Sequence, residues 1–295
     1  MDGVVNVNKP SGMTSHDVVM MARRMLKENR IGHTGTLDPL ATGVLVLCIG
    51  KATRIAQYLE AGQKEYRAEM RLGITTDTLD ADGRVLETRT YKAPDRAAIL
   101  EVVHRFTGTI MQTPPAFSAV KIAGTPSHKL ARQGRAVPNK PRPATIHSID
   151  LTGFEDPFVR LRVRCAKGVY IRSLCADIGE ALHAGAHLTS LQRTRSGRFS
   201  IDKAVTMEAL AQMIDAGTIE SAVTSIDEAL ADFPSVAVAD TDAGRVLHGS
   251  RIFCSADAPG TCGRPGMVRV HDSLGRLLSL ARHDGATIFP EVVFS

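Results

Sequence analysis

Three short segments show the hydrophobic patterns of β-strands. In residues 64–72 (KEYRAEMRL), apolar and charged positions alternate, with Tyr66 on the apolar side. Residues 158–165 (FVRLRVRC) repeat this alternation, with arginine at every second position. Such alternation predicts strands with one buried face, and the apolar run at residues 44–49 (VLVLCI) predicts a short buried strand.

Apolar residues recur at helical spacing in other parts of the chain. The pattern predicts helices at residues 17–26, 96–106 and 171–182, and further helices at residues 207–214 and 219–230. These helices and the strands mix without a regular strand–helix–strand rhythm. The pattern therefore favours an α+β fold with a mixed, largely antiparallel sheet.

The last part of the chain has a different character. Residues 236–295 are rich in Val, Gly and short alternating runs, and they follow Pro234. This pattern is typical of a small β-rich unit. We therefore expect two domains, a larger domain at residues 1–234 and a smaller domain at residues 235–295.

Charge is distributed unevenly along the chain, whose formal net charge is +5 at pH 7. Residues 102–149, 157–176 and 181–201 are rich in Lys and Arg and poor in acidic residues, whereas residues 202–244 contain nine acidic residues and few basic ones. Such segregation indicates a polyanionic partner, because cations that neutralise phosphates release counterions. The alternative is a solvated basic face that binds nothing.

The longest basic stretch includes a segment rich in proline. Residues 122–145 hold four prolines and two glycines, which predicts a projecting segment with some helix around residues 129–132. A basic projection at about residues 121–145 is suited to grip a phosphate backbone, although a flexible basic loop without a function has the same pattern. The candidate RNA-binding residues are Lys121, Lys129, Arg132, Arg135, Lys140 and Arg142.

Several classes of protein are disfavoured by composition and missing motifs. The longest apolar run near the N-terminus is too short to cross a bilayer, and the opening residues, MDGVVNVNKP, lead us to expect no signal peptide. Five cysteines without a C-x-x-C pair predict free thiols in a reducing, cytoplasmic compartment and no zinc site. Neither a P-loop nor a G-x-G-x-x-G motif occurs. With 4% aromatic residues and no Trp, a broad platform for stacking bases is not expected.

The most informative stretch is residues 30–49, a loop rich in Gly and Thr that leads into the buried strand. Asp38 lies there between Leu37 and Pro39, and the proline favours an extended or turn conformation for Asp38. A carboxylate with apolar neighbours is costly unless a cation pairs with it. Asp38 is therefore a candidate functional residue, and the alternative is an Asx-turn that caps the loop.

Residues 32–45 (GHTGTLDPLATGVL) resemble the catalytic motif of the TruB family of pseudouridine synthases. Further motifs of the family follow in the same order along about the first 235 residues. The tail resembles a small PUA-like RNA-binding domain. The other segments that carry the resemblance are NKPSGMTSHDVV at 8–19, KEYRAEMRLGITTDTLDADG at 64–83, QTPPAFSAVKIAG at 112–124, KGVYIRSLCADIG at 167–179 and LTSLQRTRSGRFS at 188–200.

The resemblance implies roles for particular residues. Asp38 would be the catalytic carboxylate, Arg172 would pair with it and keep it ionised, and Tyr66 would pack on the target uracil and handle a proton. The implied substrate-binding residues are His33, Tyr170, Leu191 and Lys9, and residues 121–145 match the segment that the family calls the thumb. The alternatives are a core residue for Tyr66, a phosphate contact for Arg172 and a surface position for Lys9.

The chain departs from the family pattern at two positions. His128 stands in the thumb where members usually carry Tyr, which puts one RNA contact in doubt. Val169 stands before Tyr170 where Thr is more usual. Neither difference touches the residues with implied catalytic roles.

The implied activity is isomerisation of uridine 55 in the T loop of tRNA to pseudouridine. No electrons enter and no outside group is transferred, so no cofactor is expected, and no metal. The base must leave its stack to be turned over, and Asp38 could then attack C6 of the base, attack C1′ of the sugar, or assist elimination. The sequence does not choose among these routes.

Two other functions remain open at this point. One is a non-catalytic protein that binds or folds tRNA, and the other is a guide-dependent rRNA pseudouridine synthase that needs partner proteins. The short N-terminus and the lack of basic terminal extensions favour a stand-alone monomer whose partner is the T-arm stem-loop of tRNA.

Overall fold

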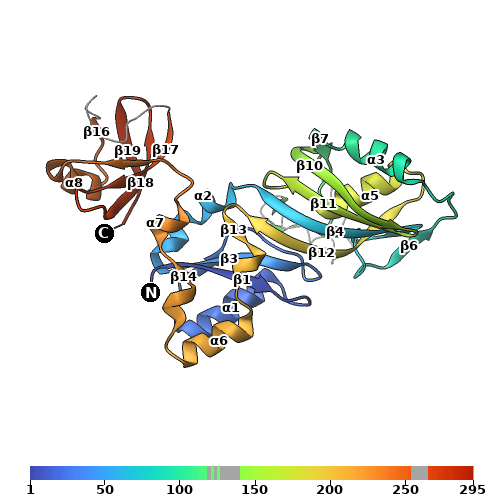
Figure 1. Cartoon of the computed structure of the whole chain (residues 1–295), viewed down its shortest axis with the longest axis horizontal. Coiled ribbons are helices and arrows are strands. Elements are labelled where there is room, and N and C mark those ends of the chain that lie inside the picture. The colour runs from blue at the N-terminus through green and yellow to red at the C-terminus, as the bar shows by residue number, and fades with distance from the viewer. Residues whose placement is uncertain (118–120, 123–124, 127–139, 254–264, 295) are drawn as a thin grey trace.

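The structure is a computed structural model, and it describes residues 1–117, 121–122, 125–126, 140–253 and 265–294. Figure 1 shows two β-rich parts, a large one and a smaller one near the C-terminus. The larger sheet has ten strands, and its only parallel pair within the named strands of the described chain is β12 with β3, so the expected α+β fold with a largely antiparallel sheet is confirmed. Its strands run in the order β14 (Val223–Thr224), β1 (Gly3–Lys9), β3 (Thr42–Ile49), β12 (Ala186–Ser196), β4 (Lys64–Leu72), β11 (Phe158–Cys165), β10 (Arg142–Glu155) and β7 (Gly108–Gln112), with β2 (Ile31–His33) beside β3 and β13 (Phe199–Ser200) beside β12.

The strand patterns in the sequence correspond to two kinds of burial in this sheet. In β4, Tyr66 and Met70 are buried while Arg67 and Arg71 are exposed, as alternation predicts. By contrast, β3 is buried on both faces, because its alternate residues enter two separate hydrophobic clusters. The loop that carries Asp38 therefore leads into one of the most deeply buried strands.

In the described part of the chain, four helices of more than eight residues pack on the larger sheet, and three begin at side-chain caps. Thr14 and Asp17 form a capping box for α1 (Ser15–Leu26), and Asp95 accepts from Ala98 at the start of α3 (Arg96–Arg105). Thr206 caps α6 (Met207–Asp215), whereas α5 (Ile171–Ala181) begins at Tyr170 without a side-chain cap. Apolar faces of all four helices join one hydrophobic cluster with β4, β11 and β12.

One expected helix is wrong. Residues 219–230 form a 3-10 turn, η3 (Ile219–Ala222), then β14, and then a short helix, α7 (Ile226–Ala229). Val223 pairs with Val5 at the edge of the larger sheet, and Ser225 then caps α7. Sheet pairing of a β-branched residue thus overrides the helical spacing.

The second sheet has five strands, in the order β15 (Ser235–Ala237), β17 (Gly266–His271), β18 (Leu277–His283), β19 (Thr287–Val293) and β16 (Ile252–Phe253). The expectation of a β-rich tail is confirmed. The tail also contains a helix, α8 (Asp240–Leu247), which the sequence pattern did not predict. Arg54 donates to the carbonyl of Val293 at 2.6 Å and Tyr58 donates to Glu291 at 2.7 Å, so this sheet contacts the larger part. The division into domains 1–234 and 235–295 stays a prediction.

Short elements connect the main ones. They are η1 (Gly50–Ile55), α2 (Ala56–Glu60), β5 (Ile74–Thr76), β6 (Val85–Thr88), β8 (Lys121–Ile122), β9 (Thr125–Pro126) and η2 (Ile201–Lys203). Within the described ranges, no helix is long and apolar enough to cross a membrane. Cys48, Cys165 and Cys175 are free and buried, and burial raises the pKa of each thiol to about 12, which keeps them unreactive.

A glycine permits the only parallel strand pairing of the described larger sheet. Gly43 has a φ of +101°, and a Cβ there would clash with the carbonyl oxygen of Arg193, its partner on β12. Gly43→Ala is therefore expected to lower the free energy of unfolding by roughly 2–4 kcal/mol, because a strained backbone and a clash combine. Urea unfolding measures this change.

Gly12→Ala is the matched control for this substitution. Gly12 also has a positive φ, +82°, but a Cβ added there would meet no atom within 4 Å. It should lose only about 1–2 kcal/mol, the ordinary cost of a left-handed backbone. Equal losses in the two variants would show that close approach of β12 does not matter.

Candidate active site

A cavity of about 240 Å³ opens between the loop that precedes β3, the strands β4 and β12, and the start of α5. The strands β3, β12 and β4 are neighbours in the larger sheet, and α5 covers one face of it. Five residues singled out in the sequence line this cavity. They are Asp38, Tyr66, Tyr170, Arg172 and Leu191.

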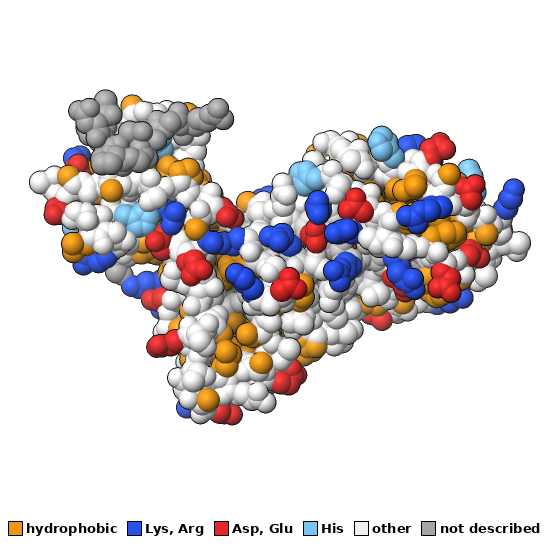
Figure 2. All heavy atoms as spheres, in the orientation of Figure 1, with side chains coloured by type: hydrophobic (Ala, Val, Ile, Leu, Met, Phe, Trp, Pro, Cys, Tyr) orange, Lys and Arg blue, Asp and Glu red, His pale blue; other side chains and the backbone are white. Residues whose placement is uncertain are grey.

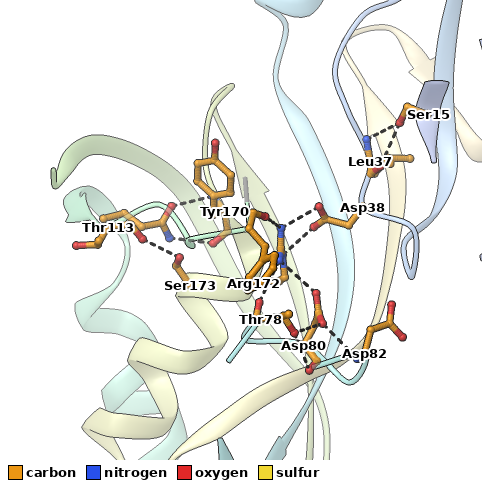
Figure 3. Close-up of polar contacts among 12 residues, drawn as sticks. Ser15, Leu37, Asp38, Thr78, Asp80, Asp82, Thr113, Tyr170, Arg172 and Ser173 are labelled. Atoms are coloured by element: carbon orange, nitrogen blue, oxygen red, sulfur yellow. Dashed lines mark hydrogen bonds and ion pairs between the residues drawn. The ribbon is translucent and has the colours of Figure 1, made fainter. Parts of the chain in front are cut away.

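Arg172 lies between two carboxylates at the wall of the cavity (Figure 3). Its Nη2 donates to Oδ1 of Asp38 at 2.9 Å, and its Nε lies 2.9 Å from Oδ2 of Asp38, so the guanidinium holds both carboxylate oxygens. Its Nη1 lies 3.3 Å from Oδ2 of Asp80. Such a fork fixes the orientation of Asp38 as well as its charge.

Backbone carbonyls complete the surroundings of this arginine. Arg172 Nη1 donates to the carbonyl of Thr78 at 3.0 Å, and Nη2 donates to the carbonyl of Phe117 at 2.9 Å. Arg172 is only 4% exposed, and Asp80 is 5% exposed and also accepts from the hydroxyl of Thr78. A phosphate contact at the surface is therefore not the role of Arg172 in this structure.

The electrostatics of Asp38 combine two opposing effects. Burial is the largest, and it raises the pKa of the Asp38 carboxyl above its usual value. The charge of Arg172 opposes that rise, and the charge of Asp80 adds to it. The expected lowering of this pKa by Arg172 is thus present as one contribution, but burial outweighs it.

The loop before Asp38 is held by a buried serine on α1. Ser15 donates through Oγ to the carbonyl of Leu37 at 3.1 Å and accepts from the Leu37 amide at 2.8 Å. The serine is 1% exposed. Both backbone groups of the residue that precedes Asp38 are therefore satisfied by one side chain.

Lys9 holds the same loop from the other side. Its Nζ donates to the carbonyls of Pro10, Met13 and Pro39 at 2.8, 2.6 and 3.2 Å, and the side chain is fully buried. Lys9 is therefore not a surface lysine. Burial lowers its pKa to about 8, although the charge of Asp38 acts in the opposite direction.

Removal of the Ser15 hydroxyl should destabilise the protein measurably. Ser15→Ala leaves a buried amide and a buried carbonyl of Leu37 without their partner, which is expected to lower the free energy of unfolding by roughly 1–3 kcal/mol. Ser11→Ala is the control, because exposed Ser11 makes one 3.2 Å bond to Leu40 and should lose little. Chemical denaturation compares the two, and equal small losses would contradict the role given to Ser15.

Tyr66 and Arg193 face the cavity from neighbouring strands. They are cross-strand partners on β4 and β12, and both are buried. Arg193 donates through Nε to the carbonyl of Val44 at 2.7 Å and through Nη2 to the carbonyl of Gly35 at 3.0 Å. Burial raises the pKa of the Tyr66 phenol, and Arg193 opposes that shift.

Tyr170 is positioned by its backbone at the start of α5. Its amide donates to Oε1 of Gln112 at 2.7 Å, and its carbonyl accepts from Nε2 of the same side chain at 2.9 Å. Leu191, on β12, is 6% exposed and belongs to the hydrophobic cluster beneath the cavity. The cavity thus combines apolar walls with the charged group around Asp38.

Two of the expected substrate-binding residues are not on the wall of this cavity. His33 lies on β2, where its Nδ1 accepts from the amide of Gly35 at 3.3 Å, and burial lowers its pKa. Lys9 lies under the loop, as described above, and its amine is occupied by carbonyls. Substrate contacts of both residues stay predictions.

The basic projection lies mostly outside the described residues. Lys129, Arg132 and Arg135 fall there, and so does the helix expected at residues 129–132. Lys121 belongs to β8, and only its backbone is described. Lys140 and Arg142 are exposed, and Arg142 begins β10. Their contacts with RNA stay a prediction.

Four residues of the site were missed in the sequence. Ser15 and Arg193 act through backbone contacts that no spacing reveals, and Lys64 lines the cavity with a pKa lowered to about 8 by burial. Asp80 lies in a stretch (TLDADG) that resembles the family, and this resemblance could have identified it as a site residue. In the described part of the chain, no group of three or more His, Cys, Asp or Glu is arranged to hold a metal ion.

Proteins of known structure share this architecture. A chain in an H/ACA ribonucleoprotein bound to a substrate RNA containing 2′-deoxyuridine superimposes with a TM-score of 0.77 and 27% identity, covering 99% of this chain and 85% of that chain. A chain of a Cbf5–Nop10–Gar1 complex gives a TM-score of 0.77 and 29% identity over the same shares.

Curated relatives are closer in sequence. The tRNA pseudouridine synthase B of Burkholderia lata is 44% identical over 291 residues, which is 99% of this chain and 89% of that protein. Its counterpart from Clostridium kluyveri is 45% identical over 252 residues, or 85% of this chain and 86% of that protein.

The fold and the curated relatives place the chain among the pseudouridine synthases, which are isomerases. Residues 23–171 match the model of the N-terminal domain of TruB family pseudouridylate synthases, and residues 172–231 match that of the tRNA pseudouridylate synthase B C-terminal domain. The chain belongs to the TruB family.

Proposed function

We propose that the protein converts uridine 55 in the T loop of tRNA to pseudouridine, without a guide RNA or a protein partner. The observation that carries this proposal is the Asp38 carboxylate, held at both oxygens by Arg172 on the wall of a cavity lined by Tyr66 and Leu191. Curated relatives that are named tRNA pseudouridine synthase B, and that match nearly the whole chain, support the choice of tRNA.

The reaction rearranges bonds within one nucleotide. The N1–C1′ bond breaks, a C5–C1′ bond forms, and the hydrogen on C5 leaves as a proton while N1 gains one, so atoms and electrons balance. The target base must leave its stack to be turned over, and a cavity of about 240 Å³ beside Asp38 offers it an enclosed place.

Asp38 acts in its ionised form on every route that we consider. The carboxylate adds to C6 of the uracil, adds to C1′ of the ribose, or assists elimination across the sugar. Arg172 fixes the orientation of both oxygens and opposes the effect of burial on the pKa of Asp38. Because each route begins from the same ion pair, the geometry supports the class of reaction and not one route.

Tyr66 and Leu191 are assigned to the base itself. The ring of Tyr66 packs on the uracil, and Leu191 closes the other side of the cavity. Because burial raises the pKa of Tyr66, its phenol is neutral at neutral pH, and the adjacent Arg193 stabilises the phenolate when a proton moves. Tyr170 and, more remotely, His33 and Lys9 support the loop and helix that frame the bound nucleotide.

The test is incubation of the purified chain alone with an unmodified T-arm stem-loop, followed by mapping of pseudouridine at nucleotide resolution. We expect one pseudouridine, at the position of uridine 55. No product with the protein alone, but product after addition of a guide RNA and partner proteins, would favour the guide-dependent alternative, to which the H/ACA chains of similar fold point. Binding of the stem-loop without product under either condition would favour a non-catalytic tRNA-binding or tRNA-folding protein.

The basic segment at residues 121–145 is proposed to grip the stem of the T arm. Lys140→Gln and Arg142→Gln are each expected to weaken tRNA binding and to flatten the plot of log affinity against log salt by about 0.9, the slope of one phosphate contact on a duplex. Lys203→Gln is the control, because Lys203 is exposed but lies in the acidic zone. Unchanged slopes for both thumb variants would remove this assignment.

The C-terminal sheet and the state of the protein in the cell also belong to this proposal. The five-stranded C-terminal sheet is proposed to be a PUA-like unit that binds RNA, and the protein is proposed to act as a cytoplasmic monomer. The hydrogen bonds of Arg54 and Tyr58 with β19 support a fixed position for this sheet.

A further inference from the structure

The two faces of the larger sheet differ at β4, β11 and β12. Tyr66 and Leu191 point to the cavity and to the cluster under α5. The intervening residues of the same strands, among them Arg67 and Gln192, point to the opposite face. Figure 2 looks onto the molecule from that side, where Lys and Arg side chains gather among acidic ones over the middle of the larger sheet.

The strand register arranges this open face in two rows. In one row, Thr42, Gln192, Arg67, Arg162 and Asp150 are successive partners on β3, β12, β4, β11 and β10. In the neighbouring row, Ser190, Glu69, Arg160 and Gly153 are partners on β12, β4, β11 and β10. The first row places Arg67 directly opposite Arg162, and like charges in that relation repel each other.

Three acidic residues of this face, near the two rows, are already paired with arginines. Glu69 accepts from Arg160 at 2.8 Å and from Thr189 at 3.1 Å, and Glu65 accepts from Arg164 at 2.8 Å. Asp150 lies 3.4 Å from Arg162. These pairs are largely exposed, so each stabilises the fold only weakly.

Arg67 differs from the other arginines of the face. It forms no ion pair or hydrogen bond with any residue that the structure describes, although it is flanked by Glu65 and Glu69 on its own strand. Its partner on one side is Arg162 and on the other is Gln192. A guanidinium with five donors therefore faces outward with no anion assigned to it.

A hollow of about 570 Å³ lies over these rows. Arg67, Arg160 and Arg162 line it, together with Glu69, whose charge is taken up by Arg160. Ser190 and Gln192 also line it, and the structure gives neither side chain a hydrogen-bond partner among the described residues. The hollow thus collects uncommitted donors around an excess of positive charge.

We propose that this hollow binds the phosphodiester backbone of RNA, at a segment other than the one whose uridine enters the cavity. Arg67 and Arg162 would contact phosphate oxygens. Among the described residues, Arg67 has no ion pair, and the only ion pair of Arg162 is the weak, exposed one with Asp150. Ser190 and Gln192 would donate to phosphate or ribose oxygens. The charge and the donors fit an anion, and the open form along two rows of a sheet fits an extended backbone. The inference rests on the family's action on RNA and is independent of which uridine is modified.

The experiment measures binding at this face while the cavity side is occupied. Wild-type protein is saturated with unlabelled T-arm stem-loop, and a fluorescent oligoadenylate, which has no uridine, is titrated in and followed by anisotropy. Because each lost single-strand phosphate contact removes about 0.7 from the salt slope, the double variant Arg67→Gln, Arg162→Gln should bind the oligoadenylate roughly tenfold more weakly and lose about 1.4 in slope.

Arg71→Gln is the matched control. Arg71 lies on the same strand and the same face, but it packs over the ring of Phe158 at 5.9 Å, outside the hollow. The affinity of this variant should stay at the wild-type value. The double variant should still modify the T-arm stem-loop at the wild-type rate, which separates this proposal from the proposed function.

Three outcomes would overturn the proposal. They are no binding of oligoadenylate to the saturated wild-type protein, equal affinity of the wild type and the double variant, and an equal loss in Arg71→Gln. Inorganic phosphate is titrated into both proteins as well. If phosphate binds the wild type but not the double variant, while both bind oligoadenylate equally, the hollow is a site for phosphate alone. That result also overturns the proposal.

Discussion

Replacement of Asp38 by Asn is expected to abolish pseudouridine formation while tRNA binding changes by less than about threefold. Asn keeps the shape of the side chain, but it has no negative charge to attack or to assist elimination, and loss of such a group commonly lowers rates by roughly a thousandfold or more. Release of tritium from C5-labelled uridine in a T-arm stem-loop measures the reaction, because the new C5–C1′ bond displaces that hydrogen. Filter binding measures affinity.

Asp82→Asn is the control for this substitution. Asp82 lies near Asp80 in the same turn, but its side chain is exposed and does not line the cavity (Figure 3). It should keep nearly full activity. Normal turnover in Asp38→Asn would remove Asp38 from the mechanism.

Replacement of Arg172 by Met should have the largest effect on stability. The variant leaves Asp38 and Asp80 without the cation that both contact, and breaking such a buried pair from one side commonly lowers the free energy of unfolding by about 3–5 kcal/mol. Activity should be lost as well, because nothing then orients Asp38. Urea unfolding at neutral pH measures the first effect, and an unchanged midpoint would contradict it.

The pH dependence of this variant has a definite sign. Burial already raises the pKa of Asp38 in the folded protein, and Arg172 opposes that rise. Without Arg172 the folded-state pKa moves further above the unfolded value, so the ionised carboxylate destabilises the fold increasingly as pH rises through this interval. The stability deficit of Arg172→Met should therefore shrink as the pH is lowered toward the usual pKa of Asp.

Arg172→Lys tests orientation separately from charge. Lysine keeps a cation but cannot hold both oxygens of Asp38 in a planar fork. The rate should fall, and the acidic limb of its pH profile should move to higher pH because Asp38 is less well stabilised as an anion. A profile identical to that of the wild type would show that the bidentate contact is unimportant.

The periodicity of the chain predicted the strands β3, β4 and β11 and the four main helices because their burial is regular. Residues 64–72 alternate in sequence and in the structure, and α5 begins at Ile171 as its apolar spacing indicates. Spacing failed where a neighbour decided the conformation, since Val223 pairs with β1 instead of continuing a helix. In the C-terminal part, the helix α8 is short and lies among strands, so its pattern was lost among alternating runs.

Five of the residues that line the candidate site were singled out in the sequence, but the geometry of the site was not predictable from it. Asp38 and Arg172 are 134 positions apart, and only the family resemblance joined them before the structure placed them 2.9 Å apart. The supporting contacts of Ser15 and Lys9 are made to backbone atoms, which leave no pattern of residue types. The burial of Asp38 also reversed the expected net direction of its pKa shift, because burial depends on the whole fold.

A crystal structure of Asp38→Asn bound to an unmodified T-arm stem-loop tests the central claim most directly. We predict that the target uridine is turned out of its loop and lies in the cavity, against the ring of Tyr66, with residue 38 beside its glycosidic bond. A target base that stays stacked in the loop, or that occupies a different part of the protein, would contradict the assignment.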